Sequence, residues 1–163
     1  GLAKHSKSSM GYFYGFKLHL VINEKGQIIA LKMTKGNVDD RVPVPELTEN
    51  LTGSIYADKG YIKQNLFINL YERGLKMLHG IKKNMPNKLM NLEDKILLRK
   101  RNLIETVFDY LKNKMNLEHT RHRSPINAFV HIISTLIAYS LKSNKPAINY
   151  NFDLPLNFAL IPN

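Results

Sequence analysis

Apolar and polar positions alternate in the first part of the chain. Phe16, Leu18 and Leu20 are separated by polar residues, which is the period of a half-buried β-strand. The alternation extends on both sides of a Glu-Lys-Gly turn sequence, so residues 11–34 are predicted to form a hairpin of two strands. The opening residues, 1–11, show neither a helix start nor a strand alternation. The hairpin therefore looks like the middle of a sheet whose first strand lies elsewhere.

Beyond this hairpin, helical and strand periods follow each other along the chain. The predicted elements are a short helix after Pro45, a strand at 54–58, a helix at 63–73, a strand at 75–81, a long helix from about Leu92 and a last helix from Ser124-Pro125 to about Lys142. Strands separated by helices favour an α/β fold. We expect one domain over residues 1–145, followed by a Pro- and Asn-rich extended tail over residues 146–163.

The last helix contains the longest apolar run of the chain, AFVHIISTLIAYSL, which is interrupted by His131, Ser134 and Thr135. It is shorter than the roughly 18 residues of a membrane span and predicts a buried helix. No signal peptide is visible, which favours a cytoplasmic location. The chain has no cysteine, and this excludes disulfides and thiolate metal sites.

Positive charge dominates the composition. Lys and Arg number 24 against 13 Asp and Glu, a formal net charge of +11. This excess favours a polyanionic partner, with nucleic acid first. Lys4 and Lys7 give the N-terminal segment a basic character, and a basic loop, KKNMPNKLM, precedes the long helix. No zinc finger or RNA-binding signature is present, so phosphate contacts rather than base reading are expected.

One carboxylate of the long helix stands out. On a helical wheel of about 100° per residue, Arg101, Glu105 and Lys112 form one stripe at the border of the apolar face. The structural interpretation is an ion pair between Arg101 and Glu105 one helical turn apart. The functional interpretation is that Glu105 binds a hard metal ion such as Mg²⁺ while the two cations grip phosphates. A metal site of this kind needs a second carboxylate from another element.

Asp58 is the best candidate for that second carboxylate. It follows SIYA at the C-terminal end of the strand at 54–58, and open α/β sheets place their ligands at the carboxyl ends of strands. Its structural interpretation is a turn residue in the sequence DKG. If Asp58 and Glu105 lay more than about 10 Å apart and faced different ways, metal-dependent catalysis would lose its basis.

Other candidate ligands are weaker. Asp39 and Asp40 are adjacent loop acids for which capping or turn roles are expected. His119 and His122 are three residues apart, but arginines are interleaved with them. Phosphate contact by Arg121 and Arg123 is therefore favoured over metal binding by the histidines.

Several motifs occur in an order that resembles a known family. The segments are GYFYGFKLHLVINEKGQIIALKMTKGNVDDR, YADKGYI and RNLIETVFDYLKNKMNLEHTRHRSPINAFVHIISTLIAYSL. Over about residues 1–145 they resemble the DDE transposases of bacterial insertion sequences, and most closely the group of insertion sequence 982. The resemblance implies an RNase H-like mixed sheet flanked by helices, double-stranded DNA as partner (transposon ends and target), and a dimer on the bacterial nucleoid. It also implies two Mg²⁺ ions, or Mn²⁺ in their place, held by three acids that direct cleavage and strand transfer.

The resemblance assigns roles to residues of this chain. Asp58 matches the second acid of the family and Glu105 the third, which makes both of them expected catalytic and metal-binding residues. The expected DNA phosphate contacts are Arg101, Lys112, Lys59, Arg121 and Arg123. A tyrosine of the family's helix signature is replaced here by Leu98, so no tyrosine hydroxyl is expected at that position.

The family's first acid has no counterpart among these residues. It lies on the opening strand of the sheet, upstream of the segment that matches Gly1. We therefore expect the C-terminal part of a transposase that is incomplete at its first strand and inactive alone. The alternative is a basic DNA-binding remnant or regulatory module without catalysis. The two hypotheses differ in whether Asp58 and Glu105 come together.

Overall fold

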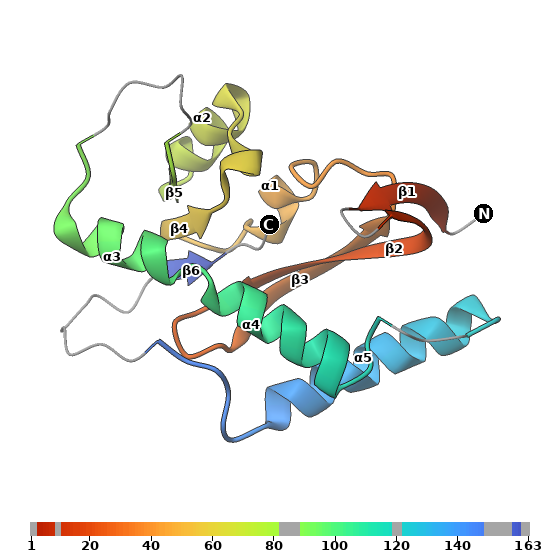
Figure 1. Ribbon diagram of the computed structural model, residues 1–163. Coiled ribbons are helices and arrows are strands. Elements are labelled where there is room, and N and C mark those ends of the chain that lie inside the picture. Colours follow the sequence, from red (N-terminus) through yellow and green to blue (C-terminus); the bar gives the residue numbers. More distant parts are fainter. Residues whose placement is uncertain (1–2, 9–10, 82–88, 119–121, 149–157, 161–163) are drawn as a thin grey trace.

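The computed structural model describes residues 3–8, 11–81, 89–118, 122–148 and 158–160 (Figure 1). Its strands are β1 (Lys4–Ser8), β2 (Gly11–Ile22), β3 (Ile28–Lys35), β4 (Gly53–Ala57), β5 (Leu75–His79) and β6 (Phe158–Leu160). Its helices are α1 (Val44–Leu47), α2 (Gln64–Glu72), α3 (Leu92–Lys100), α4 (Leu103–Asp109) and α5 (Pro125–Leu141), with a 3₁₀ turn at Lys59–Tyr61 and a π-helical turn at Tyr110–Lys114.

The strands form one mixed sheet. Its order is β1-β2-β6-β4-β5, and β3 also pairs with β2. The strand β2 is long enough to pair antiparallel with β1 through its first half and with β3 through its second half. On the other side of the sheet, β4 pairs in parallel with β5 and β6. The predicted α/β class with a mixed sheet flanked by helices is confirmed.

The centre of the sheet is filled by the C-terminal strand β6. Leu160 is aligned with Ile22 of β2 on one side and with Tyr56 of β4 on the other, so β6 lies between these two strands (Figure 1). It comes from the tail over residues 146–163, for which we expected only an extended course. Open strand edges need hydrogen-bond partners, and β6 supplies them to both neighbours. Its three residues are Phe158, Ala159 and Leu160, so this central strand carries no acid.

The sheet is covered on both faces, which gives the domain two hydrophobic clusters. Side chains of β2 alternate between them: Leu20 and Ile22 join the cluster under α3, α4 and α5, whereas Val21 joins the cluster under α1 and α2. Ile55 of β4 is fully buried in the second cluster, and its neighbour Tyr56 is buried in the first. The run of apolar residues in β4 thus reflects a strand buried on both faces.

The predicted long helix from Leu92 is divided. The segments α3 and α4 are separated by a turn at Arg101 and Asn102, where the Ile104 N–H donates to the Arg101 carbonyl three residues back. This tighter hydrogen bond is of the 3₁₀ type. At the other end of α4 the Met115 N–H donates to the Tyr110 carbonyl, five residues back, which is the π-helical pattern.

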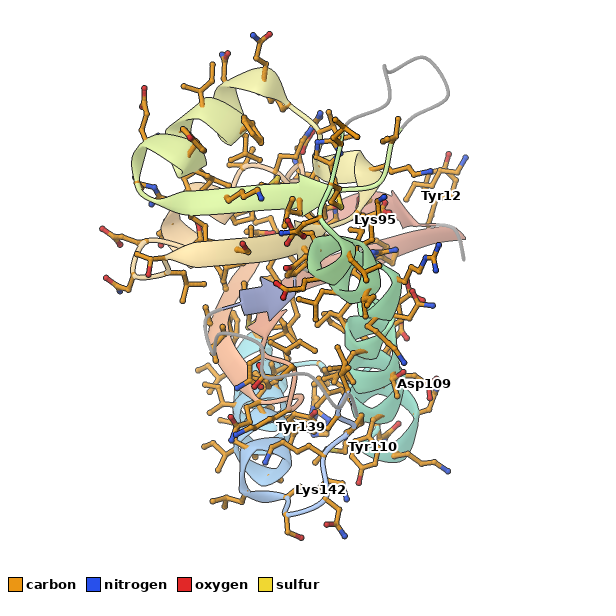
Figure 2. All side chains as sticks on the ribbon, turned by 90° about the vertical axis from the view of Figure 1, so that its left-hand side faces the viewer. Tyr12, Lys95, Asp109, Tyr110, Tyr139 and Lys142 are labelled. Carbon is orange, nitrogen blue, oxygen red and sulfur yellow. The ribbon has the colours of Figure 1, made fainter. Side chains whose placement is uncertain are left out.

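The helix α5 is less buried than predicted. Thr135, Leu136 and Tyr139 are buried, and the Phe129 ring lies 5.0 Å from that of Phe16 in β2. At its C-terminal end the Tyr110 ring contacts Tyr139, and the Lys142 amine lies over Tyr110 (Figure 2). The opposite side of α5 exposes five apolar residues: Ile126, Val130, Ile133, Ile137 and Leu141. Among the described residues, no helix has the length and hydropathy of a membrane span.

The strand β1 was not predicted. Its residues, Lys4–Ser8, are polar and lack an apolar alternation, so no signal within the segment marks a strand. It forms because the first half of β2 offers a backbone partner for the whole of its length. Together β1 and residues 11–15 of β2 form a two-stranded arm.

Candidate metal and nucleic-acid site

Asp58 lies at the carboxyl end of β4, as the strand pattern predicts. Its side chain begins the 3₁₀ turn, because the Oδ2 atom accepts a 3.3 Å hydrogen bond from the Gly60 N–H. The turn role weighed from the sequence is therefore real. It involves one carboxylate oxygen, and the other oxygen, Oδ1, faces Arg101.

Arg101 brings the two predicted acids together. Its NH2 nitrogen lies 3.5 Å from Oδ1 of Asp58 and 3.7 Å from Oε1 of Glu105. The two carboxylate oxygens therefore lie no more than about 7 Å apart, a distance that two metal ions about 3.5–4 Å from each other can span. Asp58 and Glu105 are therefore closer than the separation of about 10 Å beyond which they could not share a metal site.

Burial differs among these three side chains. Arg101 is only 15% exposed, whereas Asp58 is 34% and Glu105 48% exposed. The carboxylates are thus open to solvent on one side, and the guanidinium lies behind them. The ion pair between Arg101 and Glu105 that the structural interpretation predicts does form. At these distances the Arg101 guanidinium attracts both carboxylates through opposite charge.

The donor set suits a hard cation. Carboxylate oxygens are the ligands that Mg²⁺ and Mn²⁺ prefer, and partial exposure leaves room for the waters that Mg²⁺ retains. The described part of the chain has no cluster of three or more acids, histidines or cysteines able to hold a metal ion. Among the described residues, Asp58 and Glu105 therefore form a pair of acids without a third candidate ligand beside them.

Lys59 extends the positive charge of the same edge of the sheet. It is exposed, follows Asp58 directly, and its aliphatic stem lies along Gly80, just beyond the end of β5. A Cβ atom on Gly80 would come within 2.8 Å of the Lys59 side chain. The glycine thus leaves space for the lysine to cross the ends of both parallel strands.

Lys112 does not meet the two acids. It lies seven residues beyond Glu105, about 10 Å along the helix axis, and its amine pairs at 3.3 Å with Glu118. The wheel assumed a regular helix, whereas Lys112 sits in the π-helical turn, which changes its angular position. A phosphate contact by Lys112 stays a prediction and would have to compete with Glu118.

The second basic segment is described in part. Arg123 is exposed and lies two residues before the start of α5, while Arg121 and His119 lie outside the described residues. The His122 ring lies 5.2 Å from that of His131, and His131 contacts the Asn116 carbonyl oxygen. These contacts connect the segment before α5 to the helix and to the end of the π-helical turn.

The adjacent loop acids have structural partners. Asp39 accepts hydrogen bonds from the backbone and the guanidinium of Arg41, and these bonds hold the pKa of Asp39 well below its ordinary value. Asp40 forms a 2.9 Å ion pair with Lys17. Asp39 thus has the turn role expected from the sequence, whereas Asp40 connects the loop after β3 to Lys17 of β2.

Tyr61 is a buried residue of this region that the sequence reasoning missed. It closes the 3₁₀ turn after Asp58, and its side chain is 4% exposed. Burial raises the pKa of its phenol, and the negative charges of Asp40, Asp58 and Asp39 add to the effect. In the sequence DKGY the tyrosine stands three residues after Asp58, and this closeness is the signal from which Tyr61 could have been found.

Most of the chain matches a known protein family. Residues 1–125 match a family model described as a transposase DDE domain, and this span covers Asp58, Arg101, Glu105 and Lys112. Comparisons with curated proteins and with solved structures give no significant match. The matched span includes every described element from β1 to the π-helical turn and ends at the first residue of α5.

Proposed function

Because the chain belongs to the transposase DDE domain family, we propose that it is the catalytic part of a DNA transposase of the insertion sequence 982 group. The reaction is metal-dependent cleavage of a phosphodiester and transfer of the DNA strand at insertion-sequence ends. The observation that carries the proposal is the meeting of Asp58 and Glu105 at one guanidinium. Asp58 lies at the end of a strand, and Glu105 lies in a helix 47 positions later. If Glu105 were only an exposed charge on its helix, it would have no reason to lie close to Asp58.

Asp58 and Glu105 are the residues that would hold Mg²⁺ or Mn²⁺. Metal bound there supplies charge stabilisation for in-line displacement at phosphorus. The protein positions the two ligands: the hydrogen bond from the Gly60 N–H orients Asp58, and α4 carries Glu105 toward Asp58. Arg101 neutralises part of the charge of the two carboxylates, and its guanidinium would also pair with a DNA phosphate that reaches the same site.

The DNA-binding part of the proposal rests on charge. The chain carries a formal net charge of +11, and Lys59 and Arg123 are exposed. Contacts of this kind bind double-stranded DNA with strong salt dependence and little base preference. We assign Lys59, Arg101, Arg121, Arg123 and Lys112 to the phosphates of the transposon end and target.

Catalysis by these 163 residues alone is proposed to be weak or absent. Three acids are expected in the complete site, and the described residues provide two. The central strand β6, which lies beside β4, carries no acid. This observation favours the alternative function, a basic DNA-binding module without catalysis. The two functions differ over Asp58 and Glu105, because the alternative gives these acids no role as metal ligands.

The test is to locate bound metal without relying on turnover. Fe²⁺ replaces Mg²⁺ at carboxylate sites, and with ascorbate and peroxide it generates radicals that cleave the polypeptide near the ion. We expect cleavage close to residues 58 and 105 that excess Mg²⁺ suppresses. Asp58→Asn and Glu105→Gln should each remove it, whereas Glu72→Gln, at an exposed acid of α2, should leave it unchanged. Uniform cleavage, or cleavage indifferent to both substitutions, would support the non-catalytic alternative.

The helix α5 offers a surface for the dimer that we propose to act on DNA. Its exposed apolar residues recur every three or four positions, the spacing with which two helices pack along a seam. Residues 125–141 contain no Lys, Arg, Asp or Glu, so two copies of a strongly basic chain would not bring like charges together there. A two-fold axis makes such a contact self-complementary.

A further inference from the structure

The two-stranded arm presents a row of exposed aromatic and cationic side chains. Tyr12 is 83% and Tyr14 61% exposed. The register aligns His5 with Tyr14 and Lys7 with Tyr12, so all four side chains lie on one face of the arm. The His5 and Tyr14 rings are 4.8 Å apart, and the Lys7 amine lies 5.4 Å from the centre of the Tyr12 ring.

The arm extends from the edge of the sheet that carries Asp58. Leu160 is aligned with both Ile22 and Tyr56, so these two residues lie at the same level in antiparallel strands. Asp58 lies two residues beyond that level on β4, and Tyr14 lies eight residues beyond it on β2. At about 3.3 Å per residue, Tyr14 is some 20 Å past Asp58 along the strand direction. Figure 2 shows Tyr12 at the margin of the molecule.

The base of the arm is fixed by close backbone packing. The Gly36 N–H donates a 3.0 Å hydrogen bond to the Gly15 carbonyl. A Cβ atom on Gly36 would lie 3.0 Å from the Lys4 carbonyl oxygen and 3.0 Å from the Phe13 ring. The end of β3 therefore holds both strands of the arm, and Tyr12 and Tyr14 project from an anchored support.

The strands that carry these tyrosines contain lysine and no acid. Residues 1–23 include Lys4, Lys7 and Lys17 and no Asp or Glu, and Lys17 is the lysine that pairs with Asp40. An acidic protein surface could pair with the lysines, but it would not by itself supply a stacking partner for the exposed tyrosine rings. Nucleic acid uses both, because its phosphates pair with lysine and its bases stack on aromatic rings.

We propose that Tyr12 and Tyr14 form a stacking platform for unpaired bases of the DNA whose phosphodiester is cleaved beside Asp58. Lys7, on the same face of the arm, contacts the phosphates of the same DNA strand. This inference rests on the proposed transposase function and adds to it a single-stranded substrate region about 20 Å from the cleavage site. Bases in a duplex are already stacked on each other, so the platform favours single-stranded over double-stranded DNA.

The chain contains no tryptophan, and this allows a direct optical test. Tyr14→Trp introduces one indole at the platform, and Tyr71→Trp introduces one at a comparably exposed tyrosine of α2 (64% exposed). Titration with a single-stranded oligo(dT) should quench the indole of Tyr14→Trp and leave that of Tyr71→Trp unchanged. A blunt duplex of the same length should quench the indole of Tyr14→Trp much less at equal saturation.

Affinity is measured in parallel by fluorescence anisotropy of the labelled oligonucleotides. Replacing Tyr12 and Tyr14 together by Ala should weaken oligo(dT) binding about fivefold or more per tyrosine, whereas the Phe replacements keep the stacking surface and should bind like the parent. Tyr71→Ala is the matched control and should have no effect. Lys7→Ala should weaken both DNA forms and lower the salt dependence.

Two results would overturn the proposal. One is oligo(dT) binding by anisotropy without any quenching in Tyr14→Trp. The other is an unchanged affinity of the double Ala variant for oligo(dT). If that variant also loses self-association, the tyrosines form a contact between protein chains instead. Either result leaves the metal assignment intact, because radical cleavage at residues 58 and 105 is measured without DNA. Loss of that cleavage with retained quenching would instead remove the transposase chemistry alone.

Discussion

The phenol of Tyr56 in β4 donates a 2.9 Å hydrogen bond to the carboxylate of Asp94 in the first turn of α3. Both groups are buried, and the Lys76 amine of β5 lies 3.1 Å from the other carboxylate oxygen. Tyr56 is two residues before Asp58, and Asp94 is seven residues before Arg101. The hydrogen bond therefore fixes α3 against the strand whose end carries the candidate metal ligand.

We predict that Asp94→Ala lowers the free energy of unfolding by about 1–3 kcal/mol, because it leaves the buried Tyr56 hydroxyl without this acceptor. Glu93→Ala, at the exposed neighbouring acid, should change it by less than about 0.5 kcal/mol. Urea unfolding followed by circular dichroism measures both. Equal effects of the two substitutions would show that Asp94 does not hold α3 in place.

Arg101 should oppose metal binding and assist DNA binding. Arg101→Gln removes a positive charge within 4 Å of both carboxylates while keeping most of the side-chain volume. We expect Mn²⁺ to bind more tightly, as measured by electron paramagnetic resonance of free Mn²⁺, because the ion no longer competes with the guanidinium. DNA affinity should fall in the same variant. Changes of the same sign in both affinities would contradict the two roles given to Arg101.

The turn between β2 and β3 depends on a glycine for two separable reasons. Gly26 has a φ of 67°, and a Cβ atom there would overlap the Pro146 carbonyl oxygen. Gly74 has a similar φ of 79° but open space around its Cβ position. Gly74→Ala should therefore lose about 1 kcal/mol of unfolding free energy from backbone strain alone. Gly26→Ala should lower the free energy of unfolding by clearly more than Gly74→Ala does. Equal losses in the two variants would mean that the backbone at Pro146 moves aside without a cost.

The sequence predicted correctly those strands and helices that show their own pattern of apolar and polar residues. The alternation through Phe16 and Leu20 gave β2, and the helix expected at 63–73 is observed at Gln64–Glu72. The strand-end rule and the helical wheel pointed to Asp58 and Glu105 as partners, and the structure places them at one guanidinium.

What the patterns did not predict depends on non-local pairing or on irregular helix geometry. The strand β1 forms only against β2, and β6 only between two strands more than 100 residues earlier in the chain. No Gly or Pro marks the break at Arg101 and Asn102 or the π-helical turn around Lys112. The wheel therefore kept Lys112 on the stripe of Glu105, whereas its amine pairs with Glu118.

His19 should make stability depend on pH. It is 5% exposed, contacts the Thr34 hydroxyl at 2.8 Å, and burial lowers its pKa below the ordinary 6.5. Lys17 and Lys32 lower this pKa further, and Asp40 acts in the opposite direction. The unfolded chain then binds the proton at a higher pH than the folded chain, so stability is full above about pH 6.5 and falls as the pH decreases below it.

The measurement is urea unfolding at pH 7.5 and pH 5.5, which brackets the ordinary histidine pKa and stays above that of carboxylates. The parent should be less stable at the lower pH. His19→Gln keeps a polar side chain beside Thr34 without a titrating group, so most of the difference should vanish. A difference of the same size in this variant would assign the pH dependence to another group.

The apolar side of α5 should mediate dimer formation. Lysines in place of Ile133 and Ile137 would bring like charges together across the two-fold axis, so dimer formation on duplex DNA should be lost in analytical ultracentrifugation. Both positions are exposed in the monomer, so its unfolding free energy should change little. Ala138→Lys adds the same charge at an exposed position of the same helix outside the apolar row, and should leave association unchanged. If all of these variants associate like the parent, α5 faces a different partner, because an uncharged apolar seam cannot accept two facing lysines without a penalty.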